Sequence, residues 1–252
     1  MSWRWAASSL IGTGHLERDG KLEDAYVVRA VGDGIYVAIV ADGAGSALYG
    51  KHGAWLVCRR ILQRMKENVS AKKSLVPDIE MFKDWIDDIR DEISHHAKKR
   101  QSIPRQFATT VAGIIFNDDQ LAHFSIGDSA VVARKGDEWL TLCFPENGEY
   151  ASTTYFLTDE PWPKFQFARI ENDFDAFSLF TDGIAEIALS FQEGCAHKPF
   201  FDRMILPIDR LAAPGISKDL SSSLKLWLGS EKVCQRVDDD KTIILISGIV
   251  NE

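Results

Sequence analysis

The sequence has few cysteines, and they lie far from one another. Four cysteines occur among the 252 residues, at positions 58, 143, 195 and 234. They form no CxxC pair, and no histidine stands at zinc-ligand spacing from them, so a structural zinc site is not expected. Isolated cysteines favour reduced, buried thiols, and we therefore expect a cytoplasmic protein.

Basic clusters and long apolar runs are also missing. The formal net charge is −8, and no stretch combines lysine and arginine with interleaved aromatic residues. A nucleic-acid or membrane partner is therefore disfavoured, whereas an acidic chain suits cation binding. No apolar run approaches the roughly 20 residues of a membrane-spanning helix, and the opening MSWRWAASSLIGTG lacks the apolar core of a signal peptide. We expect a monomer without nucleic-acid or membrane partners.

The chain shows no internal linker. It contains no Pro/Gly/Ser-rich stretch, no low-complexity tract and no repeat of solenoid period. Its hydrophobic content of 45% is enough to build a full core. We expect a single domain over residues 1–252.

The pattern of apolar residues predicts an α+β fold. Helical periodicity occurs at 54–65 and 82–93, and Leu211–Leu228 is a further candidate helix. The two clear helices follow each other between groups of strands, which favours antiparallel sheets with helices on their outer faces. The predicted strands are Trp3–Ser8, Ala25–Ala30, Ile35–Val40, Thr109–Phe116, Leu121–Ile126, Ala130–Ala133, Ala176–Phe180 and Thr242–Ile249.

Residues 37–52, VAIVADGAGSALYGKH, allow two interpretations. The segment matches the phosphate-binding loop G-x-x-x-x-G-K-[ST] at every defined position except the last. However, His52 occupies the hydroxyl position, where an imidazole is a poor ligand for Mg²⁺. Asp42 would also repel a triphosphate, and the βαβ context is absent. The second interpretation, a carboxylate that binds metal, is therefore preferred.

Aspartates recur where apolar runs end or begin. Asp42, Asp128 and Asp182 each follow such a run, and residues 238–240 precede the last one. Singly, each fits an ordinary Asp-Gly turn or a helix cap. Together, converging carboxylates repel one another unless they share cations, and oxygen ligands suit Mg²⁺ or Mn²⁺. Two such ions about 3.5–4 Å apart can hold a bridging hydroxide, which predicts hydrolysis of phosphate esters.

Motifs in order along the chain carry a family resemblance between about Gly12 and Ile246. They are GTGHLERDGKLEDAYVV, VADGAGSALYGKHGA, FATTVAGIIF, SIGDSAVV, LFTDGIAE and DDDKTIILI. In this order they resemble the metal-dependent protein phosphatases of type 2C, most closely the bacterial branch. The resemblance implies a four-layer α-β-β-α sandwich with two central antiparallel sheets, and dephosphorylation of phosphoserine and phosphothreonine.

The resemblance also implies the ligands of two metal ions. Asp42 would bridge both ions, and Gly43 would offer its carbonyl oxygen to one of them. Asp182 and Asp239 would complete the shell of the other ion, with Asp239 chosen over its neighbours because of its spacing to Thr242.

Three further carboxylates are implied more indirectly. Glu23 and Asp24 would hold metal-bound waters, with Asp24 the stronger candidate. Asp128 would help to bind the third, weaker metal of the bacterial relatives.

The chain departs from the family pattern at three places. Asp19 stands where the family has a phosphate-holding arginine, which leaves His15 or Arg18 as candidates for that role. Ala44 stands where animal relatives have a histidine, so no side chain is expected to act as general acid. Residues 147–160, NGEYASTTYFLTDE, do not match the usual flap sequence, which leaves the substrate preference open.

The leading hypothesis is a serine/threonine protein phosphatase that uses two Mn²⁺ or Mg²⁺ ions, with a third ion as an option. Phosphorylated proteins would be its substrates and a serine/threonine kinase a candidate partner. One alternative is a non-catalytic binding module of the same fold, suggested by Asp19. Another is a phosphatase for phosphotyrosine or small phosphate esters.

Overall fold

The computed structural model describes residues 2–18, 20–32, 34–71, 76–146 and 154–249. Its main feature is a pair of β-sheets. The first sheet has the strand order β12 (Gly215–Ile216), β1 (Ser2–Leu10), β13 (Lys241–Ile249), β9 (Ala176–Phe180), β6 (Ala130–Lys135) and β7 (Glu138–Cys143). The second sheet has the order β2 (Ala25–Gly32), β3 (Ile35–Ala41), β4 (Val111–Phe116), β5 (Gln120–Ile126) and β8 (Gln166–Glu171).

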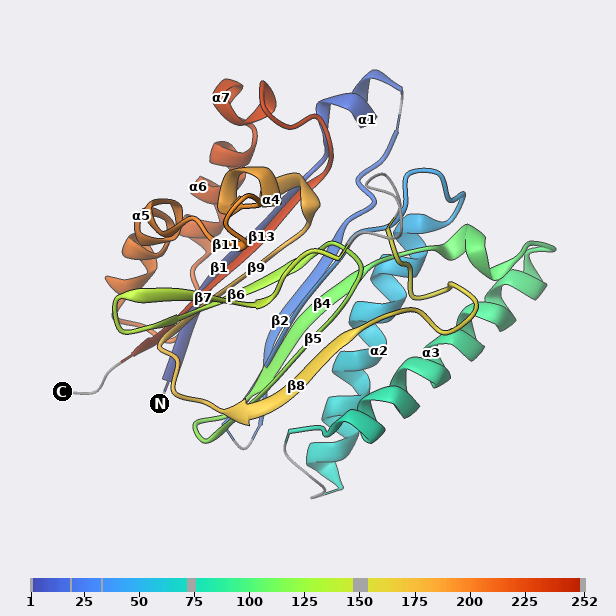
Figure 1. The fold of residues 1–252 in the computed structure, drawn as a ribbon, viewed down its shortest axis with the longest axis horizontal. Helices are drawn as coiled ribbons and strands as arrows, with labels where there is room; N and C mark the ends of the chain where they lie inside the picture. Colours follow the sequence, from blue (N-terminus) through green and yellow to red (C-terminus); the bar gives the residue numbers. More distant parts are fainter. Residues whose placement is uncertain (1, 19, 33, 72–75, 147–153, 250–252) are drawn as a thin grey trace.

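Helices cover the outer faces of both sheets, so the molecule has four layers (Figure 1). The long helices α2 (Gly50–Ser70) and α3 (Ile79–Lys99) lie on the second sheet. On the first sheet lie α5 (Lys198–Asp209) and α6 (Lys218–Leu228). The remaining short elements are α1 (Thr13–Glu17), η1 (Pro104–Phe107), α4 (Asp182–Ala188), α7 (Glu231–Cys234) and the hairpin β10 (Leu189–Ser190) with β11 (Cys195–Ala196). The predicted α+β class and layering are confirmed.

Strand β3 shows why both faces of a sheet are buried. Every second residue, starting from Ile35, faces the cluster under α2 and α3, whereas Ala38 and Val40 face the other sheet. Successive side chains of a strand point to opposite faces, so a continuous apolar run is expected of a strand between two apolar layers. The apolar cluster between the two sheets contains residues of both sheets, among them Trp3, Phe116 and Phe177.

Three parts of the fold differ from the expectation. Strands β7 and β8 and the two-residue strands β10, β11 and β12 were not predicted; β8 lies at a sheet edge with three residues exposed, three half-buried and none buried, so it lacks an apolar signal. The predicted helix 211–228 begins only at Lys218, because Gly215, with φ +94°, belongs to the short strand β12. That strand pairs with β1 in parallel, so the first sheet is not wholly antiparallel.

The strand register brings one end of several strands together. Ala25 pairs with Ala41, Leu10 with Lys241, and Ile243 with Phe180. Because these pairs are antiparallel, the start of one strand lies beside the end of the next. The loops that carry the predicted site residues therefore meet at one end of the strands of both sheets, which is called the site edge below.

Among the described helices, none combines the length and the apolar composition needed to cross a bilayer.

Candidate metal centre

Asp42 directly follows β3, and the Thr-Thr pair before β4 fixes its backbone. The Asp42 carbonyl accepts hydrogen bonds from the Thr110 amide and the Thr109 hydroxyl, both at 2.8 Å. The Asp42 amide donates to the Thr110 hydroxyl at 3.2 Å. These bonds leave the carboxylate as the free group at the end of the strand.

Gly43 allows the start of α2 to approach the strand end. A Cβ at this position would lie 2.3 Å from the carbonyl carbon of Gly50. Only glycine permits this contact without a shift of the backbone. The absence of a side chain thus brings α2 against the loop that follows Asp42.

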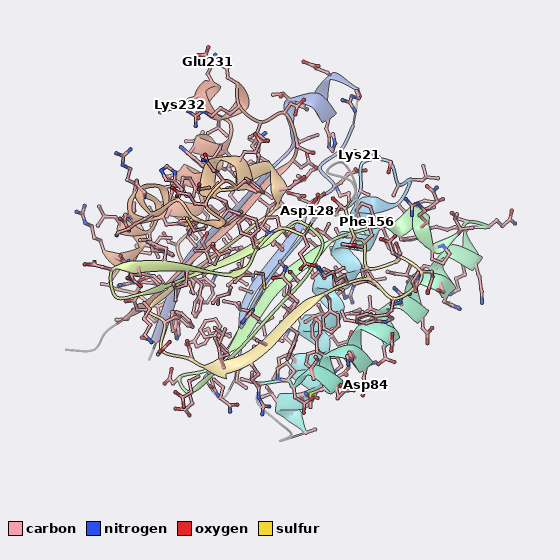
Figure 2. The ribbon with its side chains drawn as sticks, in the orientation of Figure 1. Lys21, Asp84, Asp128, Phe156, Glu231 and Lys232 are labelled. Atoms are coloured by element: carbon pink, nitrogen blue, oxygen red, sulfur yellow. The ribbon has the colours of Figure 1, made fainter. Side chains whose placement is uncertain are left out.

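Three carboxylates meet at the site edge. Asp42, Asp128 and Asp182 each offer an oxygen atom, and these atoms lie within 4.8 Å of one another. Asp182 is the first residue of α4, and Asp128 follows Gly127, which has φ +100°, in the turn between β5 and β6. Figure 2 labels Asp128 where these strands end.

Asp24 lies buried beside this group, with 6% of its surface exposed. One of its carboxylate oxygens accepts hydrogen bonds from the hydroxyls of Thr242 at 2.6 Å and Thr181 at 2.9 Å. Its other oxygen is buried and has no hydrogen-bond partner. A buried carboxylate with one free oxygen is poised to accept from a further group.

The carboxylates raise one another's pKa values. Burial, followed by the charges of Asp128, Asp239 and Asp24, raises the pKa of Asp182 to about 8. Burial raises the pKa of Asp24 to about 7 although its threonine hydrogen bonds act in the opposite direction. Burial and the neighbouring carboxylates likewise raise the pKa of Asp42 well above its usual value. These charges are costly together unless cations compensate them.

Asp239 and Asp240 form a second cluster with His15. The Nδ1 atom of His15 lies 3.2 Å from an Asp240 oxygen, and its Nε2 atom lies 3.6 Å from an Asp239 oxygen. Asp240 is buried and accepts hydrogen bonds from the amides of Gly12 at 2.7 Å and Glu23 at 2.6 Å. Asp239 is half exposed and lines a cavity of about 460 Å³ together with Asp128 and Asp182.

The other predicted site residues have diverse positions. Glu23 has a buried carboxylate oxygen without a partner, and burial raises its pKa. Arg18 is exposed at the end of α1, with no side-chain partner in the described part of the chain. Ala44 packs in a small apolar cluster with Ala47 and Ala108. Asp19 and residues 147–153 lie outside the described residues.

The described end of the flap-like segment is tied to the site. The Thr154 hydroxyl donates to Asp128, and the Leu157 amide donates to the carbonyl of Thr109 at 2.9 Å. Phe156, labelled in Figure 2, packs on the apolar cluster around Ala44. Thr154 therefore forms part of the wall of the cavity that Asp128 and Asp182 line.

The donor set fits Mg²⁺ or Mn²⁺. Buried oxygens without hydrogen-bond partners occur on Asp24, Asp128 and Glu23, and the group of three around Asp42 consists of carboxylates alone. Hard divalent cations prefer such oxygen ligands, and they would also offset the repulsion that raises the pKa values.

Sequence reasoning missed several residues that shape this site. The sequence favours Asp239 over Asp240, yet Asp240 accepts hydrogen bonds from the amides of Gly12 and Glu23 and lies 3.2 Å from Nδ1 of His15. The hydroxyls that hold Asp24 were also missed, although the threonine of the closing motif was noted for its spacing. Lys241 is fully buried, and its ammonium donates to the Asp239 carbonyl at 2.9 Å.

Comparisons with known proteins identify the family of this chain. The family model described as Protein phosphatase 2C matches residues 11–228. A curated relative, serine/threonine-protein phosphatase 3 of Escherichia coli (strain K12), is 31% identical over 255 residues, covering 97% of this chain and 98% of the relative.

Solved structures show the same fold at low sequence identity. The serine/threonine phosphatase PstP/Ppp of Mycobacterium tuberculosis has a TM-score of 0.66 at 16% identity, covering 99% of this chain and 100% of that one. Phosphatase Stp1 of Staphylococcus aureus has a TM-score of 0.66 at 15% identity, with 98% and 95% coverage. A PstP catalytic domain solved in complex with two manganese ions has a TM-score of 0.68 at 16% identity, with 98% coverage of both chains. Since the family model matches well over half of the chain, this chain belongs to the protein phosphatase 2C family.

Proposed function

We propose that the chain is a metal-dependent serine/threonine protein phosphatase that uses Mn²⁺ or Mg²⁺. The observation that carries this proposal is the convergence of Asp42, Asp128 and Asp182, within 4.8 Å, in a member of this family. The curated relative is named as a serine/threonine-protein phosphatase, and one similar structure holds two manganese ions. Two bound cations would supply an activated water for attack on phosphorus and offset the charge of the phosphoryl group.

The carboxylates are assigned to the ions as the family motifs imply. Asp42 would contact both ions, and Gly43 would add its carbonyl oxygen. Asp182 and Asp239 would hold the second ion. Glu23 and Asp24 would act through water, and Asp128 would serve a third ion. The partnerless buried oxygens of Asp24 and Asp128 support this assignment.

The chain's own residues hold these ligands in place. Thr109 and Thr110 fix the backbone of Asp42, while Thr181 and Thr242 orient Asp24. Such supporting hydrogen bonds typically determine how well a metal site binds.

Between the two phosphate-holding candidates, His15 is the better placed. Its Nδ1 atom lies 3.2 Å from an Asp240 oxygen, and its Nε2 atom lies 3.6 Å from Asp239, which lines the cavity. Arg18 is exposed directly after the end of α1. Ala44 is 8% exposed and has no proton to donate, so no side chain is assigned as general acid.

The substrates are phosphorylated proteins, and the kinase that phosphorylates them is a candidate partner. A single domain over residues 1–252 is supported by the apolar cluster that both sheets share. A monomer is supported by the chain's own helices, which cover the outer sheet faces. The four free cysteines, two of them buried, support a cytoplasmic location.

The test is hydrolysis of an aryl phosphate and of matched phosphoserine, phosphothreonine and phosphotyrosine peptides with and without Mn²⁺. Turnover should require the metal, favour phosphoserine or phosphothreonine, and be lost in Asp42→Asn and Asp182→Asn. Unchanged turnover in these variants would overturn the proposal. Absence of both turnover and Mn²⁺ binding by calorimetry would favour the non-catalytic binding module. A preference for phosphotyrosine or the aryl ester would favour a phosphatase for phosphotyrosine or small phosphate esters.

A further inference from the structure

A second cavity lies on the helical side of the first sheet. It has a volume of about 500 Å³, and its walls come from α4, α5, α6 and α7. Its charged side chains are Arg203, Lys232, Arg236 and Glu186. In Figure 2, Lys232 is labelled on α7, and α4 lies between it and the labelled Asp128 in that view.

Among the described residues, the three cations of this cavity have no ion-pair or side-chain hydrogen-bond partner. In the described part of the chain, Arg203, Lys232 and Arg236 have no carboxylate within ion-pair distance and donate no side-chain hydrogen bond. By contrast, Arg134 forms ion pairs with both Asp175 and Asp209. Three unpaired cations in one hollow of a chain with net charge −8 form a local site of opposite sign.

The cavity also has an apolar wall. Phe200 and Trp227 both line it, with their ring centroids 5.9 Å apart. An apolar wall lowers the local dielectric and strengthens the attraction between the cations and an anion. It also offers contact to the stem of a side chain that carries a charge at its end.

This cavity borders the cavity of the metal site. Arg236 and Glu186 line both cavities, and Arg236 stands three residues before Asp239. Glu186 is one helical turn beyond Asp182, or about 6 Å along α4. An extended peptide advances about 3.3 Å per residue, so a side chain two or three positions from a phosphoresidue at the metals can reach the cations.

We propose that this cationic pocket is a substrate subsite that binds an anionic side chain, a carboxylate or a second phosphomonoester, near the phosphoresidue that is hydrolysed. The inference rests on the proposed phosphatase function and adds to it a preference for acidic phosphoprotein segments. Arg203 and Arg236 offer guanidinium groups that pair with carboxylates and phosphates in bidentate geometry. Glu186 opposes the anion and limits its affinity.

The test compares four phosphoserine peptides that differ only at the second or third position from the phosphoserine. This position carries glutamine, glutamate, a non-hydrolysable phosphonate analogue of phosphoserine, or lysine. With the full chain and Mn²⁺, kcat/KM should be highest for the two anionic peptides and lowest for the lysine peptide. The glutamate and phosphonate arms show which anion the pocket prefers.

Substitutions then locate the effect. Arg203→Gln and Lys232→Gln should each reduce the ratio of kcat/KM between the glutamate and glutamine peptides by roughly two- to fivefold. Glu186→Gln should raise this ratio, and added salt should lower it. The matched control is Lys225→Gln, which removes an exposed cation of α6 that lines neither cavity, and the ratio should stay at the wild-type value.

The outcomes separate this inference from the phosphatase function. Mn²⁺-dependent turnover of the glutamine peptide tests the function alone. If that peptide is hydrolysed and the wild type does not favour the anionic peptides, or if Arg203→Gln and Lys232→Gln keep the full preference, the subsite is wrong. Should one variant fail to fold, the charge reversal Lys232→Glu must still shift the preference towards the lysine peptide, and an unchanged preference overturns the proposal.

Discussion

The hydroxyl of Thr242 donates a 2.6 Å hydrogen bond to Asp24, across 218 positions of sequence. Thr181, which directly follows β9, donates to the same oxygen, so one hydroxyl on the first sheet and one beside it hold a carboxylate that directly precedes β2 of the second sheet. Burial raises the pKa of Asp24 to about 7, and these hydrogen bonds lower it towards the charged form. The two threonines therefore link the packing of the sheets to the charge state of the site.

Replacing this hydroxyl should weaken metal binding. Thr242→Val keeps the shape of the side chain but removes one donor to Asp24, which raises the pKa of Asp24 further. We expect Mn²⁺ affinity to fall by roughly 10-fold or more, as for other residues that support metal ligands. Isothermal calorimetry at pH 7 measures it.

The control is Ser9→Ala. The Ser9 hydroxyl lies 2.6 Å from the Thr242 hydroxyl and forms no hydrogen bond with Asp24. Its removal should leave Mn²⁺ affinity near the wild-type value. Equal losses in the two variants would show that the hydrogen bond to Asp24 is not the cause.

The metal-free protein should lose stability as the pH rises. The folded pKa values of Asp24 and Asp182 are raised to about 7 and about 8, so between about pH 4 and pH 8 the folded state holds protons that the unfolded state has released. The unfolded state binds fewer protons, and the free energy of unfolding therefore falls with pH, by at most about 1.4 kcal/mol per pH unit for each group.

Thermal unfolding in EDTA checks this sign. The Tm should fall by roughly 10 °C between pH 5.5 and pH 7.5. Saturating Mn²⁺ binds the charged carboxylates and should remove or reverse the trend. A metal-free Tm that rises over this range would contradict the raised pKa values.

Asp182→Asn should have opposite effects with and without metal. Without metal, the variant lacks one of the repelling carboxylates, so its Tm at pH 8 should exceed that of the wild type, and the difference should shrink at pH 5.5. With Mn²⁺, the wild type gains binding energy that the variant cannot match, and the order should reverse. Differential scanning fluorimetry in EDTA and in Mn²⁺ tests the crossing, and the same order in both buffers would refute it.

Asp240→Ala should destabilise the fold itself. It leaves the amides of Gly12 and Glu23 without their acceptors, at a cost of about 1–3 kcal/mol each where no water replaces the carboxylate. Urea unfolding measures this cost. The control Asp238→Ala removes an exposed neighbouring carboxylate and should change the free energy of unfolding by less than about 0.5 kcal/mol. Similar values for both variants would mean that the two hydrogen bonds contribute little.

Much of the fold and of the candidate site could be predicted from local sequence. The apolar runs that form β3 and β9 are visible because both faces of these strands are buried. The edge strand β8 has no such signal, since none of its residues is buried. Aspartates at run ends were recognised because a strand end is marked by its neighbours in sequence.

The surroundings of those aspartates could not be predicted from local sequence. Asp239 and Asp240 are adjacent and chemically identical, yet one faces the cavity and the other is buried on two amides. Which of them turns inward depends on how the loop before β13 packs against Gly12, where a Cβ would lie 2.2 Å from the Asp238 carbonyl oxygen. Contacts of this kind leave no trace in local sequence pattern.

The sequence by itself determined that carboxylates stand at the ends of buried strands, because burial patterns and turn residues are local properties. The tertiary structure alone decided which of these groups share a space, which hydroxyls hold them, and that Arg236 joins a cationic pocket to the metal cavity. The physical reason is the antiparallel register. It places residue 10 beside residue 241 and residue 25 beside residue 41, and so converts distant positions of the chain into neighbours that share charge, hydrogen bonds and solvent exclusion.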